Sequence, residues 1–251
     1  MPYGYHGRIL HVNLTTGSIT IEEPDERFYR RYMGGSAMGL YYLLKNTPPG
    51  VDPLAPENTL ALMVSPLTGV PISGQSRMTA TTRSPLTGMV GDSQCGGFWP
   101  AEFKFTGFDG VVIWGRAEKP VYLWIHDGEA ELRDAGPLWG RITHDVQIAL
   151  EEELGDRRIE VLQCGPAGEK GVRFAAMINM SNRANGRTGM GAVMGSKNLK
   201  AVVVRGKQRP ALADRDAVKA LTQWGAEHAP DDMGSMSLLG TTALVRTQHS
   251  R

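Results

Sequence analysis

The sequence predicts an α+β fold with mixed sheets rather than a doubly wound parallel sheet. Short apolar or alternating segments follow one another in hairpin order, and few strict strand–helix–strand units occur. The 251 residues can bury one substantial core or two modest ones. Hydrophobic residues make up 41% and charged residues 21%, which is typical of a globular protein and argues against disorder.

Turn residues and helix-ending residues divide the first half into elements. Thr15-Thr16-Gly17 separates two alternating segments and predicts a hairpin. Gly34-Gly35 ends one helical pattern, and Pro48-Pro49-Gly50 ends the next. In order, we predict strands over 8–14 and 18–23, helices over 25–32 and 37–45, strands over 60–64 and 77–82, and a helix that begins near 100 and ends within 103–108.

Three strand patterns open the second half. The segment 110–114 is apolar throughout, and Asp127-Gly128 joins the next two strands as a tight turn. The amphipathic segment 143–154 predicts a helix with an acidic end. In order, we predict strands over 110–114, 121–126 and 130–134, a helix over 143–154, strands over 159–163 and 172–180 around a turn at 165–168, a helix or turn near 192–199, and a strand over 201–205.

A change of composition marks a domain boundary. The polar segment 206–210 follows the last predicted strand, and 214–229 then has a helical pattern. We therefore predict an N-terminal domain over 1–207 and the incomplete beginning of a helical second domain over 208–251.

The pentapeptide Ser-Pro-Leu-Thr-Gly occurs twice, at 65–69 and at 84–88. In each copy the proline stiffens the entry of a turn and the glycine permits a positive φ. The repeat predicts two similar turns at the same end of a sheet. A stronger interpretation is that both turns line one site.

Charge and cysteine content exclude several classes of partner. Lys and Arg number 27 against 26 Asp and Glu, a net charge of +1, so no strong field attracts nucleic acid or an anionic membrane. No run approaches the roughly 20 apolar residues of a membrane span. Two cysteines without a secretory signal favour a cytoplasmic location.

Glycine is over-represented, with 31 residues, and three loops of small residues, 73–77, 92–97 and 182–192, carry the candidate chemistry. Uncovered amides in such loops form anion-binding concavities, and arginine fits a phosphate with its planar fork. Arg183 and Arg187 lie four apart among glycines, which predicts a phosphate cradle. A glycine-rich connection with surface arginines is the alternative, since neither a dinucleotide fingerprint nor P-loop spacing is present.

The cysteines and histidines do not have the spacing of a metal site. Cys95 stands beside two glycines without a histidine nearby in sequence to activate it, so we interpret it as a small buried residue. Cys164 precedes a Gly-Pro corner and is interpreted as core. The six histidines show neither H-x-x-H nor H-E-x-x-H spacing, which argues against a histidine metal site.

Six motifs in order give the chain a specific resemblance. They are G-R-I-L-H-V-N-L-T-T-G at 7–17, V-D-P-L-A-P-E-N at 51–58, P-L-T-G at 66–69, S-P-L-T-G at 84–88, G-P-A-G-E at 165–169 and R-x-x-G-R-x-G-x-G-A-V-M-G-S-K-N-L-K-A at 183–201. Together they resemble the tungsten-containing aldehyde:ferredoxin oxidoreductase family from about residue 4 to residue 206, with weaker similarity in the helical part.

The resemblance implies an N-terminal domain of two related sheet-plus-helix halves that form a base for a bis-pterin cofactor. In that family the cofactor is a tungsten or molybdenum ion held by two molybdopterins. Magnesium bridges the pterin phosphates, and a [4Fe–4S] cluster lies adjacent. The expected partners are an aldehyde, which is oxidised to a carboxylic acid, and ferredoxin or an electron-transfer subunit.

The resemblance also assigns cofactor contacts position by position. Arg77 matches an arginine between pterin and cluster. Gln94 and Gly96 match an asparagine and a glycine that contact the pterin, and the change to glutamine favours a backbone contact there. The backbone carbonyls of Gln94 and Ala184 are expected near the magnesium ion. The second contact loop contains Arg183, Ala184, Gly186 and Arg187.

The family's cluster ligands, a C-x-x-C-x-x-x-C group and a later cysteine, have no counterpart in this sequence. Its catalytic acid and base residues are expected downstream, so no residue here is assigned as catalytic. We therefore expect a fragment that is inactive alone, with an apolar cofactor face that favours low solubility or homo-oligomers. Two alternatives stay open: a non-enzymatic pterin-binding or assembly module, and a relative that reduces an aromatic acyl thioester.

Overall fold

A computed structural model describes residues 3–249 of the chain, in two compact units. The first comprises 3–69 and 76–211, and the second comprises 70–75 and 212–249. The division into domains 1–207 and 208–251 stays a prediction, because compact units of one chain do not show that each part folds alone.

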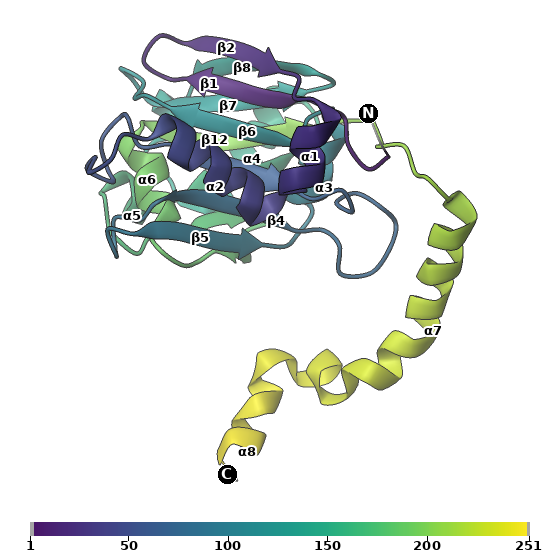
Figure 1. Cartoon of the computed structure of the whole chain (residues 1–251). Coiled ribbons are helices and arrows are strands. Elements are labelled where there is room, and N and C mark those ends of the chain that lie inside the picture. The colour runs from purple at the N-terminus through teal and green to yellow at the C-terminus, as the bar shows by residue number, and fades with distance from the viewer. Residues whose placement is uncertain (1–2, 250–251) are drawn as a thin grey trace. The chain divides into compact units, whose positions relative to one another are not determined.

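The first unit contains two six-stranded mixed sheets (Figure 1). The strand order of the first sheet is β2-β1-β6-β3-β4-β5. A hairpin joins β1 to β2, and β1 runs parallel to β6. Its strands are β1 Ile9–Asn13, β2 Ser18–Glu22, β3 Leu60–Val64, β4 Met78–Arg83, β5 Val90–Cys95 and β6 Gly110–Trp114, and the helices of this half are α1 Glu26–Tyr32, α2 Gly35–Asn46 and α3 Trp99–Phe105.

The second sheet has the order β11-β10-β9-β12-β7-β8. The predicted turn between β7 and β8 is formed by Asp127 and Gly128, whose φ angles of 44° and 92° suit the primed turns of tight hairpins. Its strands are β7 Val121–His126, β8 Glu129–Asp134, β9 Glu160–Cys164, β10 Met177–Asn179, β11 Arg183–Asn185 and β12 Leu199–Arg205, with helices η1 Gly136–Leu138, α4 Thr143–Leu154, α5 Pro166–Glu169 and α6 Met190–Ser196.

Three apolar clusters hold these layers together. The largest joins the two sheets and includes Leu62 of the first and Val202 of the second. Met38 of α2 packs on the other face of the first sheet, and Leu150 of α4 packs on the other face of the second. Each such buried side chain contributes about 1.5–3 kcal/mol. The predicted α+β fold of two sheet-plus-helix halves is therefore confirmed.

The two copies of Ser-Pro-Leu-Thr-Gly lie at opposite ends of the first sheet. They follow β3 and β4, which pair antiparallel with Val64 opposite Met78. Strands that run in opposite directions end at opposite edges of a sheet. The prediction of a shared end is therefore wrong, and the stronger interpretation of one shared site fails with it.

Several predicted segments differ from the structure. Residues 183–185, expected in the 182–192 loop, form β11, and residues 166–168, expected in a turn, belong to the short helix α5. Residues 92–95, expected in a loop, belong to β5, which pairs with β4 over its whole length. Gly, Asp and Ser have low strand propensity, but tertiary pairing overrides it here. The strand expected over 172–180 is a strand only over Met177–Asn179, because the chain before it turns where Ala175 N donates to Val172 O.

The second unit is helical, with α7 Arg215–Leu239, η2 Gly240–Thr242 and α8 Ala243–His249. Asp214 caps α7, since its Oδ1 accepts from Ala217 N at 2.8 Å. The helix expected over 214–229 is thus present and extends further. Among residues 3–249, no helix combines the length and apolar character needed to cross a bilayer.

A buried lysine at the end of α6 makes stability dependent on pH. Lys197 is fully buried, and its Nζ donates to Pro56 O at 3.0 Å and Gly115 O at 3.3 Å. Burial, with the charge of Arg116, lowers the pKa of Lys197 from 10.5 to about 7. Between these values the unfolded chain binds more protons than the folded chain, so the free energy of unfolding rises with pH.

We expect Lys197→Met to flatten this rise between about pH 7 and 10, because the variant has no ammonium group to titrate. The measurement is urea unfolding at several pH values, with Lys119→Met as the exposed control. If the free energy of unfolding of Lys197→Met rose with pH as steeply as that of the wild type and the control, Lys197 would be charged in the folded protein.

Candidate functional site

The candidate site lies along β5, at the edge of the first sheet that meets the second half. Side chains along β5 alternate, with Asp92 and Gln94 exposed and Ser93 and Cys95 buried. Because alternate side chains of a strand lie on opposite faces, Asp92 and Gln94 share one face.

Buried hydrogen bonds attach the 182–192 loop to β5 and its neighbour. The fully buried Asn185 donates from Nδ2 to Ser93 O at 2.6 Å. The Ser93 hydroxyl accepts from Arg187 N at 3.3 Å, and Ser84 Oγ donates to Thr188 O at 2.8 Å. These contacts position two segments that are far apart in the sequence.

A second set of contacts attaches the end of β5 to β10. Asn179 Nδ2 lies 3.0 Å from Cys95 Sγ and donates to Gly96 O at 3.1 Å. Burial raises the pKa of the Cys95 thiol, although the Asn179 hydrogen bond and the charges of Arg77 and Arg183 act in the opposite direction. Cys95 is 2% exposed, so its interpretation as a small buried residue is confirmed.

An open cavity of about 670 Å³ lies between β5 and the 182–192 loop. Four of the predicted cofactor residues line it together: Gln94, Ala184, Gly186 and Arg187. Asp92 and Ser93 complete the lining; they belong to the predicted loop 92–97, but no cofactor contact is predicted for them. The sequence signal for their position is the alternation of β5, which is weak because the strand is mostly polar and has a glycine as its second residue.

The remaining predicted residues lie outside this lining. Arg77 directly precedes β4 and lines a second hollow, Gly96 directly follows β5, and the exposed Arg183 begins β11. Ser76 Oγ donates to Gly97 O at 2.5 Å, so the start of β4 is tied to the end of β5. Residues 73–75, the rest of the first predicted loop, belong to the second unit.

Glycines around the cavity are of two kinds. Gly189 has φ of 77°, and a Cβ atom there would overlap the Arg173 carbonyl oxygen; a Cβ at Gly91 would lie 2.9 Å from Thr188 Oγ1. The fold itself requires these glycines. At Gly186 and Gly96 the nearest atoms to a built Cβ are 3.7 and 3.5 Å away, and neither residue has a positive φ. The fold tolerates a side chain at both, so packing does not explain why they are glycines.

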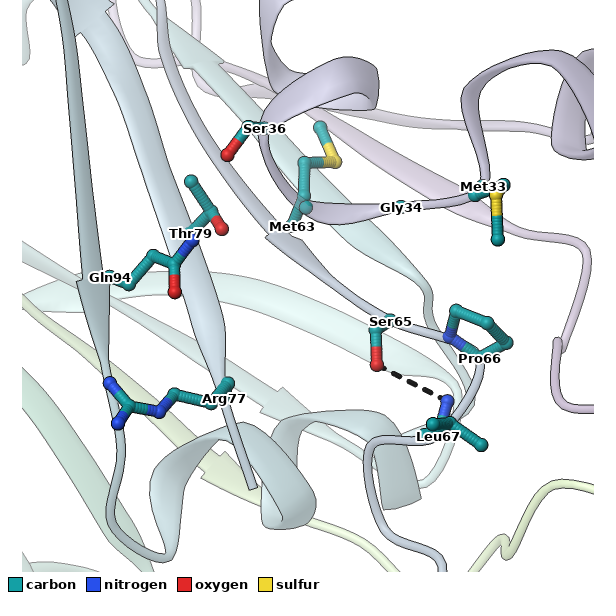
Figure 2. Close-up of a pocket in the computed structure, with 11 residues that line it drawn as sticks. Met33, Gly34, Ser36, Met63, Ser65, Pro66, Leu67, Arg77, Thr79 and Gln94 are labelled. Carbon is teal, nitrogen blue, oxygen red and sulfur yellow. Dashed lines mark hydrogen bonds between the residues drawn. The ribbon is translucent and has the colours of Figure 1, made fainter. Parts of the chain in front are cut away.

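The second hollow, of about 340 Å³, lies on the α2 side of Gln94, which lines both depressions (Figure 2). The first residues of α2 form one wall, and the turn after β3 forms another. Its lining consists of Met33, Gly34, Gly35, Ser36, Met63, Ser65, Pro66, Leu67, Arg77, Thr79 and Gln94.

Side chains do not supply a ready metal centre in the part of the chain that is described. Between residues 3 and 249, no three His, Cys, Asp or Glu side chains are grouped closely enough to hold a metal ion. Backbone carbonyls are a separate class of ligand, so the magnesium contact expected at Gln94 and Ala184 stays a prediction.

Asn185 offers a test of how the two halves are joined. Asn185→Ala removes the donor to Ser93 O and leaves this carbonyl unpaired, so we expect a loss of about 1–3 kcal/mol in the free energy of unfolding. The measurement is urea unfolding beside the exposed control Asn182→Ala. Equal stabilities of the two variants would mean that the Asn185 amide does not join the halves.

Comparisons with known proteins identify a matching family and several relatives. A family model described as "Aldehyde ferredoxin oxidoreductase, N-terminal domain" matches residues 9–206. The chain is 45% identical over 246 residues to the tungsten-containing aldehyde ferredoxin oxidoreductase of Pyrococcus abyssi, covering 97% of this chain and 40% of that protein. It is 36% identical to the aliphatic sulfonate oxidoreductase, WOR-like subunit, of Pyrococcus furiosus, covering 87% of this chain and 37% of the relative.

Among solved structures, the active site complex BamBC of benzoyl coenzyme A reductase, bound to 1,5-dienoyl-CoA, superimposes with a TM-score of 0.87 at 36% identity. The match covers 91% of this chain and 35% of the solved one. The chain thus spans about two fifths of the length of the relatives it matches. It belongs to the aldehyde ferredoxin oxidoreductase family, and residues 9–206 are that family's N-terminal domain.

Proposed function

We propose that this chain is the cofactor-binding part of an oxidoreductase that converts aldehydes to carboxylic acids and passes the electrons to ferredoxin. The observation that carries the proposal is that Gln94, Ala184, Gly186 and Arg187 line one cavity, in a chain that is 45% identical over 246 residues to part of a tungsten-containing aldehyde ferredoxin oxidoreductase. In the reaction, an aldehyde and water give a carboxylic acid, two protons and two electrons.

The residues around the cavity fit a phosphorylated pterin cofactor. Gly186 and Gly96 leave backbone uncovered where the fold has room for a side chain, which suits the close approach of a ligand. Arg187 lines the cavity, and Arg183 lies exposed two residues before Asn185. This donor set suits phosphate oxygens, which arginine binds with paired N–H groups.

We assign the roles of the chain as holding and orienting the cofactor. Arg183 and Arg187 would bind its phosphates, while Gly186 and Gly96 would admit its body close to the backbone. The backbone carbonyl oxygens of Gln94 and Ala184 would coordinate a magnesium ion, and Arg77, which directly precedes β4, would contact the pterin. The cofactor supplies the redox chemistry, and the protein supplies position and electrostatics. A tungsten or molybdenum ion and a [4Fe–4S] cluster would supply the redox chemistry of the proposed centre.

A second candidate function is the reduction of an aromatic acyl thioester. The close superposition on the benzoyl coenzyme A reductase complex favours it as the alternative. The same cradle would serve either reaction, since binding of the pterin and choice of substrate are separate tasks. A non-enzymatic pterin-binding or assembly role would need the same contacts and no reaction at all.

We expect the protein that carries this chain, purified anaerobically from cells supplied with tungstate, to reduce benzyl viologen when an aldehyde is added. The 251-residue chain alone should be inactive, because a [4Fe–4S] cluster takes four cysteine thiolates and this chain has only two buried cysteines. The assay uses a panel of aldehydes and, in the reverse direction, benzoyl coenzyme A with reduced viologen. Activity with the thioester alone would select the second function, and activity with neither would leave the binding module.

A further inference from the structure

We propose that residues 3–7 form a strap that is closed while His6 is neutral and opens when His6 takes up a proton. The closed strap lies against the end of α1, the turn after β3 and the end of the first unit. None of its residues lines the cavity beside Arg187 or the hollow beside α2. The inference is therefore independent of the proposed function, and each can fail without the other.

The two ends of the strap are fastened to three distant segments. Gly4 N donates to Ala211 O at 2.9 Å, and Tyr5 Oη donates to Met33 O at 2.7 Å. A Cβ atom at Gly4, whose φ is 85°, would lie 2.9 Å from Pro66 O, so the strap passes close to the turn after β3. Opening of the strap would release all three contacts together.

A buried carboxylate holds the centre of the strap. Asp109 is 1% exposed and accepts from His6 N at 3.0 Å and from Gly7 N at 2.7 Å. The same carboxylate pairs with the fully buried Lys104. One negative charge thus serves two strap amides and one ammonium group, in a place where water screens charges weakly.

The imidazole ring of His6 has no acceptor for a second N–H group. Among residues 3–249, its Nε2 atom is buried and has no hydrogen-bond partner, and the ring's one hydrogen bond is made to the backbone of Lys104. A protonated ring would therefore bury both a charge and an unpaired donor. Burial lowers the pKa of His6, the charges of Lys104 and Arg8 act in the same direction, and the charge of Asp109 opposes them.

The groups around the ring do not balance a second positive charge. Within residues 3–249, the charged groups that act on the ring are Asp109 directly before β6, Lys104 in the last turn of α3 and Arg8 directly before β1. The phenols of Tyr5 and Tyr29 lie near the same carboxylate, and burial raises the pKa of both, so they stay neutral. Protonation would set three cations against one carboxylate, and opening of the strap relieves this by returning the ring to water.

The sign of the pH effect follows from the pKa of His6, which lies below its ordinary value of 6.5 in the closed strap. The open strap exposes the ring to water, so it binds more protons than the closed strap in this range. Acid therefore favours opening, by at most about tenfold for each pH unit. Between about pH 7.5 and about pH 5.5 we expect the open population to rise about tenfold in total.

The test is amide hydrogen exchange of the 251-residue protein, followed by NMR at these two pH values and corrected for the intrinsic exchange rate. Glu160 and Lys197, whose pKa values are shifted to about 7, titrate in the same range, so the readout must be local. We expect protection of the Gly4 and Gly7 amides to fall about tenfold in acid, relative to the Val203 amide in the central strand β12.

His6→Gln keeps a hydrogen-bond donor and cannot take up a proton, so its Gly7 protection should change less than about twofold. His144→Gln is the matched control, because His144 is an exposed histidine on α4, and it should behave as the wild type. An NMR titration of the His6 ring in the wild type needs no variant, and we expect its midpoint below 6.5.

The proposal is overturned if Gly4 and Gly7 lose no protection in acid relative to Val203. An equal loss in the wild type and in His6→Gln would overturn it as well, because the proton would then act elsewhere. If His6→Gln fails to fold, the ring titration decides, and a midpoint at or above 6.5 rules out the strap as a proton-sensitive device.

Discussion

Asp109→Ala is expected to lower the free energy of unfolding by about 3–5 kcal/mol. Asp109 is 1% exposed and pairs with the fully buried Lys104. Its carboxylate also accepts from His6 N at 3.0 Å and Gly7 N at 2.7 Å. The alanine variant leaves a buried ammonium group and two amides without their acceptor, and burial already lowers the pKa of Lys104.

The matched control is Glu131→Ala, which removes an exposed ion pair with Arg133 and should cost about 1 kcal/mol or less. Urea unfolding of both variants measures the difference. Since Lys104 also donates to Ser65 O, at the edge of the second hollow, Asp109→Ala should loosen that wall too. An Asp109 variant as stable as the control would show that the buried pair contributes nothing net.

The second large effect is expected at the arginines of the 182–192 loop. Replacing both Arg183 and Arg187 by glutamine should reduce cofactor affinity by about a hundredfold or more, because each charge-assisted hydrogen bond contributes about 1.5–3 kcal/mol. Arg173→Gln is the control, since Arg173 is exposed in the same half and outside the cavity lining.

The measurement is the pterin retained by each variant after gel filtration, released by oxidation and quantified by fluorescence. Unfolding midpoints of all variants are compared first, because the two loop arginines are exposed and their loss should not unfold the protein. Equal retention by the double variant and the control would remove the arginines from the proposed contacts.

Local patterns predicted most elements of the fold. Thr143–Leu154 was predicted to the residue, because its apolar stripe ends at Gly155, whose φ of 66° stops a helix. β5 was missed because the segment from Gly91 to Gln94 has almost no strand propensity, and its pairing with β4 is a tertiary effect. The antiparallel direction of β4 places the two Ser-Pro-Leu-Thr-Gly turns at opposite ends of the sheet. No local sequence pattern indicates that direction.

The candidate site was predicted only in part, because its assembly also depends on tertiary contacts. The sequence indicated two loops with uncovered backbone and arginines, and the structure brings Gln94 and Arg187 to one cavity. What joins them is Asn185 bonded to a backbone carbonyl of β5, a contact between residues 92 positions apart. Gly34-Gly35 had been interpreted only as the end of a helix, whereas α2 begins there and opens onto the second hollow.

The most direct test of the central claim is the pterin and tungsten content of the protein that carries this chain, isolated anaerobically from cells grown with tungstate. Pterin is quantified by fluorescence after oxidation, and the metal is quantified by mass spectrometry. We expect two pterins for each metal ion in the wild type, and loss of both the metal and the pterins from the Arg183→Gln/Arg187→Gln variant. Metal without pterin, or the same pterin content in the wild type and the double variant, would contradict it.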